Sequence, residues 1–403
     1  MKLTILRLRR MCRFLAGFVF FISGVIKLLD PVGAGLVMDE YFRFLHIGFL
    51  APVSKVAGTA FALAESVLGA AMVTGVWKRT AAYAAFVFQG FLTILTLTLV
   101  IANPEMDCGC FGEAVHLTHM QTFMKNVVLC LMIAAAYIPM KDLAEPKKSK
   151  YVSFGIVVMS VTAFTIYSWM YIPLVDFTDF KPGMTLPASK GAADEEDRYE
   201  AVFIYEKEGL TEQFTLEHLP DSSWTFVRTE TVLKAGVKES GASLSIFDKE
   251  GEYHDGLAVE GRVMTFSVYD PEISVSEWEK LGSAIKNAEK SGFIPLLLVA
   301  CDGNSTNDIL EGVNDETRIL IESHMYLSDH KNLITMNRSN GGATYFENGD
   351  LIRKWAFRAI PDTDDFRKLE EENAIESETE RSARGKLTFQ GFLLYVTAVM
   401  LLL

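Results

Sequence analysis

Long apolar stretches separated by short polar segments dominate the first 175 residues of the chain, and a further stretch follows residue 386. Each comes close to the roughly 20 apolar residues that a helix needs to cross the hydrocarbon core of a bilayer. Only helices satisfy their own backbone polar groups there, so the membrane part is expected to be all-helical. The predicted spans are residues 12–29, 56–77, 80–102, 122–140, 152–175 and 387–403, of which the first and last are the shortest.

Beyond residue 200 the apolar runs shorten to the length of strands. They lie at 201–205, 243–247, 263–269 and 294–301. Between the last two runs, apolar residues recur at helical spacing after a cap at Ser274 or Ser276 and before a stop at Gly292. A strand, a helix and a nearly continuous apolar strand form a βαβ unit, which implies a parallel pair with a right-handed crossover.

The end of this region has the pattern of a hairpin. Residues 343–346 and 351–355 are joined through Asn348-Gly349, and Asn-Gly between apolar runs is the strongest short-range hairpin signal. A βαβ unit followed by an antiparallel hairpin is the element order of a thioredoxin-type domain. The predicted fold class is therefore a membrane all-α helical bundle followed by an α/β, thioredoxin-like extracytoplasmic domain.

These patterns divide the chain into six parts. They are a four-helix transmembrane bundle (1–145), a fifth transmembrane helix (146–176), a linker (177–200), the thioredoxin-like domain (201–370), a polar linker (371–386) and a sixth transmembrane helix (387–403).

Composition and charge support this division. Half of the 403 residues are hydrophobic and the mean hydropathy is +0.20, which is unusual for a water-soluble protein. Residues 1–173 hold 15 Lys/Arg and 9 Asp/Glu, a net charge of +6, whereas the whole chain carries −13. The region after residue 173 is therefore strongly acidic, and no nucleic-acid partner is expected.

The basic residues also predict the orientation. They cluster at 7–13, at 78–79 and at 141–150, which all fall on one side of the predicted spans. Positive charge marks the cytoplasmic side, so we expect a bacterial inner-membrane, multi-pass protein with a cytoplasmic N-terminus and a periplasmic large domain. Arg381, Arg384 and Lys386 run against this rule, but a domain of this size is translocated regardless of them.

The most distinctive local feature is the segment Cys108-Gly109-Cys110 on the loop after the third span. Glycine lets two nearby sulfurs approach where a bulkier residue would not. A strained, exposed disulfide has a raised reduction potential, so such a pair would act as an oxidant. The alternative is a pair of unreactive thiols or half of a metal site.

His116 and His119 follow the cysteines and lie three residues apart. Cysteine and histidine together are zinc ligands. We adopt the simpler interpretation that no metal is bound. The imidazoles then either lower the pKa of a neighbouring thiol or are interfacial residues without a role.

Charged residues inside the predicted bundle form a second candidate site. Lys27 and Asp30 lie at the outer end of the first span, and Glu65 lies near the middle of the second, where an ionisable side chain is costly unless paired. Lys27 is free to reach the interface, which would leave Glu65 in need of a partner. A polar pocket for a substrate or quinone and a structural helix-to-helix network both fit this set, completed by Ser23, Gly24, Ser66 and Gln89.

The other cysteines offer no second redox pair. Cys12 at the cytoplasmic end and Cys130 in mid-span are assigned to packing. Cys301 ends an apolar strand with no second cysteine nearby. An apolar environment raises the pKa of a thiol, so we expect Cys301 to be inert.

Residues 10–140 resemble the four-helix DoxX superfamily, and within it the branch that includes the methylamine utilisation protein MauE. The resemblance rests on Ser-Gly-Val-Ile-Lys-Leu-Leu-Asp-Pro at 23–31, on Glu65 and on Asp-Cys-Gly-Cys-Phe-Gly at 107–112. It implies a role in disulfide formation in periplasmic client proteins and a bundle analogous to quinone-linked disulfide-generating enzymes. Cys108 and Cys110 then become the catalytic pair. Those enzymes have a second cysteine pair for relay, and the outer loops here hold none.

The C-terminal region resembles the thioredoxin-like extension of such proteins in the Bacteroides group. Where an active thioredoxin has Cys-x-x-Cys, this chain has 270–274 (Asp-Pro-Glu-Ile-Ser), and 339–342 (Ser-Asn-Gly-Gly) replaces the cis-proline loop. The resemblance therefore implies a redox-dead binding domain. Two functions follow: thiol–disulfide exchange through Cys108 and Cys110, or a non-enzymatic membrane anchor that presents the binding domain to a partner.

Overall fold

The computed structural model separates into two compact units, residues 1–169 with 387–403 and residues 170–386. It describes residues 2–104, 106, 108–139, 146–187, 199–207, 210–215, 219–221, 223–233, 244–300, 309–371 and 374–402.

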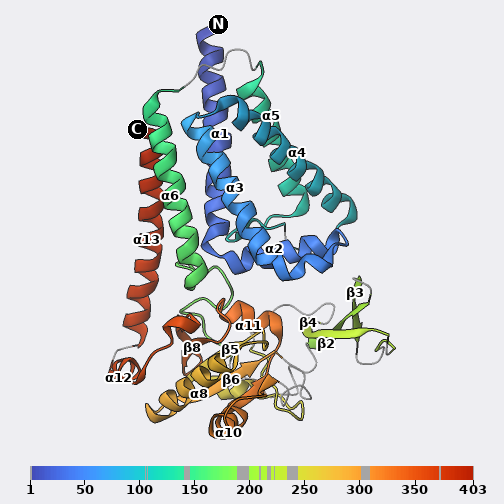
Figure 1. The fold of residues 1–403 in the computed structure, drawn as a ribbon, viewed down its shortest axis with the longest axis vertical. Helices are drawn as coiled ribbons and strands as arrows, with labels where there is room; N and C mark the ends of the chain where they lie inside the picture. The colour runs from blue at the N-terminus through green and yellow to red at the C-terminus, as the bar shows by residue number, and fades with distance from the viewer. Residues whose placement is uncertain are drawn as a thin grey trace. The chain divides into compact units, whose positions relative to one another are not determined.

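The first unit is helical (Figure 1). Its elements are α1 (Lys2–Leu29), α2 (Pro31–Phe44), η1 (Gly48–Val53), α3 (Ser54–Thr74), α4 (Lys78–Ala102), the short β1 (Cys110–Glu113), α5 (His119–Tyr137), α6 (Lys148–Met170) and the end of α13 (Ala374–Leu402). Six helical segments of the described chain are long and apolar enough to cross a membrane, and each overlaps a predicted span. The prediction of a multi-pass membrane protein is confirmed.

Helices α1 and α3 pack backbone to backbone through small residues. A Cβ added at Gly69 would lie 2.4 Å from the Phe21 nitrogen, and one added at Gly24 would lie 2.3 Å from the Ser66 hydroxyl. Small residues let membrane helices approach this closely and gain van der Waals contact without a hydrophobic driving force. The close contact fixes α1 against α3 and leaves no room for a ligand at Gly24 and Ser66.

Helix α2 lies between the first two predicted spans, where no helix is predicted, and it runs across the lower ends of α1 and α3 in Figure 1. The Asp30 carboxylate accepts a hydrogen bond from the Gly33 amide at 2.9 Å, and Pro31 occupies the first helical position. Asp as an N-cap and Pro at the first position are a standard helix start. The signal was present in the sequence and was missed.

Helices α6 and α13 form a pair within this unit. The Ser153 hydroxyl donates to the Val399 carbonyl at 2.6 Å, and the Lys150 ammonium donates to the Met400 and Leu401 carbonyls at 3.1 and 3.2 Å. A cation near the last carbonyls of a helix satisfies acceptors that lack an intrahelical partner. The predicted sixth span is therefore a helix whose end is fixed by the start of the fifth.

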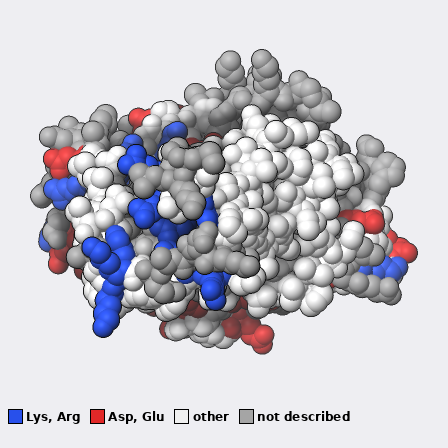
Figure 2. All heavy atoms as spheres, turned by 90° about the horizontal axis from the view of Figure 1, so that it is seen from above, with Lys and Arg blue, Asp and Glu red and all other residues white. Residues whose placement is uncertain are grey.

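Lysine and arginine side chains gather at the end of this unit where α1 begins, as Figure 2 shows from that end. Arg9 donates to the Ala136 carbonyl at 3.2 Å and to the Pro139 carbonyl at 2.8 Å, which brings the start of α1 to the end of α5. Arg13 lies against Gly75, in the turn between α3 and α4. The described parts of the basic clusters predicted to share one side of the membrane thus share one end of the bundle, since the Trp77 and Tyr151 rings also meet there.

The second unit is built on a five-stranded sheet of order β7-β6-β5-β8-β9. Strand β5 is parallel to β6 and antiparallel to β8, and β8 is antiparallel to β9. The strands are β5 (Arg262–Val268), β6 (Ile294–Val299), β7 (Met325–Leu327), β8 (Gly342–Glu347) and β9 (Asp350–Trp355). The predicted βαβ unit and hairpin are confirmed, and positive φ angles at Asn348 and Gly349 match the expected tight turn.

Helices cover both faces of this sheet. One face packs on α8 (Val275–Lys290), α10 (Asp315–His324) and α12 (Thr363–Glu371). The other packs on α11 (His330–Met336) and on residues 180–186 and 244–258. The short helices η4 (Asp255–Ala258) and η5 (Phe357–Ala359) complete the unit.

The segment 243–247 does not form the predicted strand. Phe247 makes only isolated bridges to Tyr253 and Leu327 among the described residues, which exclude residue 243. The Ile246 amide donates a hydrogen bond to the Asp255 carboxylate at 2.6 Å. In a strand this amide would instead donate to a carbonyl of the neighbouring strand. The predicted strand 201–205 does form, but in a separate sheet of order β3-β2-β4, made by β2 (Tyr199–Lys207), β3 (Leu210–Thr215) and β4 (Thr225–Leu233).

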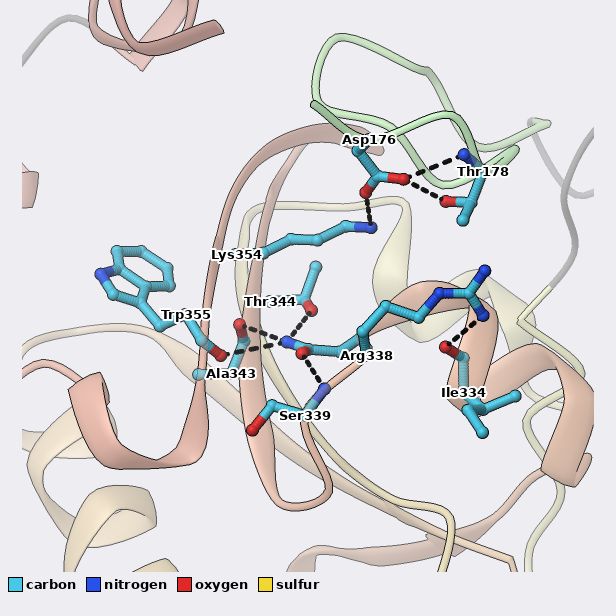
Figure 3. A network of polar contacts seen from close by, with 10 residues as sticks. Asp176, Thr178, Ile334, Arg338, Ser339, Ala343, Thr344, Lys354 and Trp355 are labelled. Atoms are coloured by element: carbon cyan, nitrogen blue, oxygen red, sulfur yellow. Dashed lines mark hydrogen bonds and ion pairs between the residues drawn. The ribbon is translucent and has the colours of Figure 1, made fainter. Parts of the chain in front are cut away.

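A buried polar network holds the hairpin of β8 and β9 in place (Figure 3). The Asn337 amide donates to the Ala343 and Trp355 carbonyls at 3.0 and 3.2 Å. The Lys354 ammonium lies 2.6 Å from Asp176, and both side chains are largely buried. The chain just after α6 is thereby tied to β9.

Candidate functional site

The two cysteines of the Cys-Gly-Cys segment lie between the end of α4 and the start of α5. Both are free thiols. Gly109 between them has a φ of 55°, and a Cβ there would lie 2.2 Å from Val37 Cγ1. This left-handed backbone packed against α2 accepts only glycine without strain.

Cys108 is paired with a histidine. Its sulfur lies 2.9 Å from Nδ1 of His119, and Nε2 of the same ring lies 3.0 Å from the Pro104 carbonyl oxygen. A carbonyl only accepts, so Nε2 must bear a proton, and in the neutral ring Nδ1 is then the acceptor for the Cys108 S–H. Proton transfer along this bond gives a thiolate beside an imidazolium, the arrangement that activates cysteine.

The two cysteines differ in exposure. Cys108 is 4% exposed, whereas Cys110 is only half-buried. Their backbones are held by hydroxyl groups from the bundle: Tyr41 donates to the Cys108 carbonyl at 2.9 Å, and Ser23 donates to the Cys110 carbonyl at 2.7 Å. Burial, reinforced by the neighbouring cysteines, raises the pKa of Tyr41 well above its usual range, so its hydroxyl remains a donor. Tyr41 was not predicted, because α2 was not predicted.

Lys27 and Glu65 form a buried ion pair close to this segment. The ammonium lies 2.7 Å from the carboxylate, and the side chains are 11% and 6% exposed. Lys27 therefore does not extend to the interface, and it is the partner that Glu65 was predicted to need. A Cβ at Gly112 would lie 3.9 Å from the Lys27 backbone, so the Cys-Gly-Cys-Phe-Gly segment rests directly on this part of α1.

The remaining members of the predicted polar pocket have structural roles. Asp30 caps α2, and Gly24 packs on Ser66. Gln89 donates to the Asn126 carbonyl on α5 at 3.2 Å. The Asp30 and Gly24 contacts favour the helix-to-helix alternative, whereas the Gln89 amide oxygen is left without a hydrogen-bond partner among the described residues.

Other candidate residues are placed as follows. His116 is exposed to solvent. The Cys130 sulfur lies 3.3 Å from the Thr93 hydroxyl, and Cys12 packs against the core between α1 and α5. Cys301 lies outside the described residues.

A group of potential metal ligands in the second unit was not predicted. Asp248, Glu252 and His254 place one ligand atom each within 4.8 Å of one another. His254 Nε2 lies 2.8 Å from Asp248, and this hydrogen bond is the main cause of a lowered pKa of Asp248. Asp248 and His254 are half-buried and Glu252 is exposed, and Asp248 also accepts hydrogen bonds from the backbone amides of Glu250 and Glu252.

Comparison with known protein families gives a match for the N-terminal part of the chain. Residues 4–139, which include the Cys108–His119 pair and the Lys27–Glu65 pair, match the family model of the methylamine utilisation protein MauE. Residues 199–238, which contain the three-stranded sheet, match a domain of unknown function, DUF8463. No curated protein and no solved structure matches the chain.

Proposed function

We propose that this MauE-like membrane protein catalyses thiol–disulfide exchange with an extracytoplasmic client protein through Cys108 and Cys110. The observation that supports it is the Cys108–His119 contact of 2.9 Å, with the tautomer set by Pro104. An inert structural cysteine needs no such base, whereas a redox cysteine must become a thiolate.

The unequal exposure of the two cysteines supports different roles for them. In the oxidised state a client thiolate attacks the sulfur of Cys110, the more exposed cysteine, the Cys108–Cys110 bond breaks, and Cys108 leaves as a thiolate that takes a proton from Nδ1 of protonated His119. A second client thiol then displaces Cys110 and completes the client disulfide. Two client thiols are oxidised and one protein disulfide is reduced to two thiols. A well-stabilised leaving thiolate accelerates such a step.

Restoring the Cys108–Cys110 disulfide requires a two-electron acceptor, for which we propose a quinone in the bundle. Residues that fit its head group lie between α4 and α5. Thr122 has a buried hydroxyl, and Gln89 and Asn126 have buried amide oxygens, all without a hydrogen-bond partner in the described part of the chain. The hydroxyl suits a quinone carbonyl, and the amide oxygens suit the hydroxyls of the reduced form.

We further propose that the second unit is a thioredoxin-like periplasmic domain that holds the client. The turn where an active thioredoxin has its cysteines is closed by Asn340, which donates to the Asp270 carbonyl at 2.7 Å and accepts from the Asp270 amide at 3.1 Å. Two loops expected to flank an active site are thus bonded to each other, which supports a binding role without thiol chemistry.

Single-cysteine variants of the full chain test the exchange reaction. The probe is a model peptide with an activated disulfide, and the mixed disulfide is quantified by mass spectrometry. Cys108→Ala, which keeps the more exposed Cys110, should capture about tenfold more peptide than Cys110→Ala, because the buried Cys108 thiolate reaches the peptide disulfide slowly. Equal capture would reject the assigned roles. If both sulfurs also stay reduced and inert to alkylation in native membranes, the exchange function fails and the membrane-anchor function is left.

A further inference from the structure

Arg13 is half-buried at the basic end of the bundle, and its Nε atom is buried. It lies on α1 near the end of the predicted span, and its guanidinium packs on Gly75, where a Cβ would lie 2.2 Å from Nη1. Gly75 has a φ of 78° and ends α3. The turn between α3 and α4 is thus shaped to admit this side chain.

Two hydrogen-bond donors at this position are unused. The Arg13 Nε atom and the Tyr137 hydroxyl are buried, and neither has a partner in the described part of the chain. Tyr137 is 0% exposed and lies in the last turn of α5. The Arg13 and Tyr137 side chains interact electrostatically, and Arg10 places a second positive charge near Arg13. Buried donors and charges are normally paired, so the arrangement points to an absent acceptor of negative charge.

The obvious internal acceptors are already taken. The carbonyls of Ala136 and Pro139, at the end of α5, accept from Arg9 at 3.2 and 2.8 Å. Arg9 is thus used to close the helix end, whereas Arg13 makes no ion pair among the described residues. A guanidinium and a phenol hydroxyl that interact electrostatically and lack a hydrogen-bond partner suit a phosphate group, which accepts several hydrogen bonds and carries negative charge.

We propose that Arg13 and Tyr137 bind the phosphate of an anionic phospholipid head group. A lipid fits better than free phosphate, because Tyr137 is the last residue of one membrane-spanning helix and Gly75 directly follows another, and head groups are found at such ends. Leu8, Met11 and Leu15 on α1 are about half exposed and offer apolar surface to acyl chains. The surrounding Lys and Arg side chains attract anionic lipids to this end (Figure 2).

Native mass spectrometry of the full chain tests this site. The protein is released from detergent with phosphatidylglycerol, phosphatidylcholine or inorganic phosphate, and bound molecules are counted. One tightly retained phosphatidylglycerol is expected, with at least about tenfold weaker retention of phosphatidylcholine. Retention of inorganic phosphate in place of the lipid would overturn the lipid assignment.

Matched variants separate the site from general charge. Arg13→Gln should reduce phosphatidylglycerol retention about tenfold, whereas Arg79→Gln removes the same charge from an exposed side chain at the same end and should change it less than about twofold. Tyr137→Phe removes only the hydroxyl and should weaken retention severalfold without affecting the fold. Equal losses in Arg13→Gln and Arg79→Gln, or an unchanged Tyr137→Phe, would overturn the proposal.

Discussion

The Lys27 ammonium and the Glu65 carboxylate meet at 2.7 Å, with both side chains at least about nine-tenths buried in a helical bundle. Lys27 also lies over the Phe61 ring, with 5.6 Å between the ammonium and the ring centroid. Taking two charges out of water is costly, and their mutual attraction offsets that cost only when both are present. The pair therefore makes each partner dependent on the other.

Removing one partner should destabilise the bundle more than removing both. We expect Glu65→Gln or Lys27→Met to lower the free energy of unfolding by about 3 kcal/mol, because each leaves an uncompensated buried charge. The double variant Lys27→Met with Glu65→Leu should recover most of this loss. Thermal unfolding of the full chain in detergent measures the cycle, and additive losses would show that the two side chains act independently.

His119 should control the reactivity of Cys108. In a Cys110→Ser background, His119→Ala removes the base that accepts the thiol proton, so the rate of Cys108 alkylation near neutral pH should fall about tenfold. His116→Ala changes the other, exposed histidine and serves as the control. The two rates are compared by quenched-label mass spectrometry, and an equal effect of both variants would remove His119 from its proposed role.

Sequence patterns predicted the membrane spans, the βαβ unit and the hairpin because each depends on local periodicity and turn chemistry. Helix α2 was missed because its 14 residues mix apolar and charged side chains and are too short for a span, although Asp30-Pro31 marked its start. The strand at 243–247 failed because a side chain nine residues away, Asp255, binds the Ile246 amide. No periodicity reveals such a competitor.

The candidate site was only partly predictable for a similar reason. The two cysteines, the two histidines and the charged residues were all visible, but which of them meet depends on how the segment after α4 folds back. His119 begins α5 and therefore reaches Cys108, whereas His116 lies before the helix. The close glycine packing of α1 on α3 brings Lys27 to Glu65. Three further contacts involve backbone carbonyls: Pro104 accepts from His119 through its carbonyl, and Tyr41 and Ser23 donate to the carbonyls of Cys108 and Cys110. A sequence pattern does not show such contacts.

The start of α8 should show a pH-dependent stability. Hydrogen bonds from the Ser274 amide and hydroxyl lower the pKa of Glu277 within the capping box. A carboxyl with a lowered pKa stabilises the fold above its unfolded-state pKa of about 4.3, and the contribution is lost as the pH falls through the folded-state value. Glu277→Gln should therefore lower the midpoint of thermal unfolding of the full chain near pH 7 and lower it less below about pH 4. Glu289→Gln, an exposed change at the other end of α8, should show no such trend, and a Glu277→Gln effect independent of pH would exclude the ionised cap.

The orientation of the bundle follows from its charged end. Basic residues at the start of α1, between α3 and α4 and before α6 should face the cytoplasm, which places the Cys108–Gly112 segment on the opposite side. In a cysteine-free background, Val115→Cys and Thr80→Cys place exposed thiols at the two ends without altering a charge. An impermeant maleimide should label Val115→Cys in intact spheroplasts and Thr80→Cys only in inverted vesicles, while Glu289→Cys in the second unit should behave like Val115→Cys. Labelling of Val115→Cys from the cytoplasmic face alone would show that the topology is the reverse of the one predicted. The Cys108 and Cys110 thiols would then face a reducing compartment, and the client could not be a periplasmic protein.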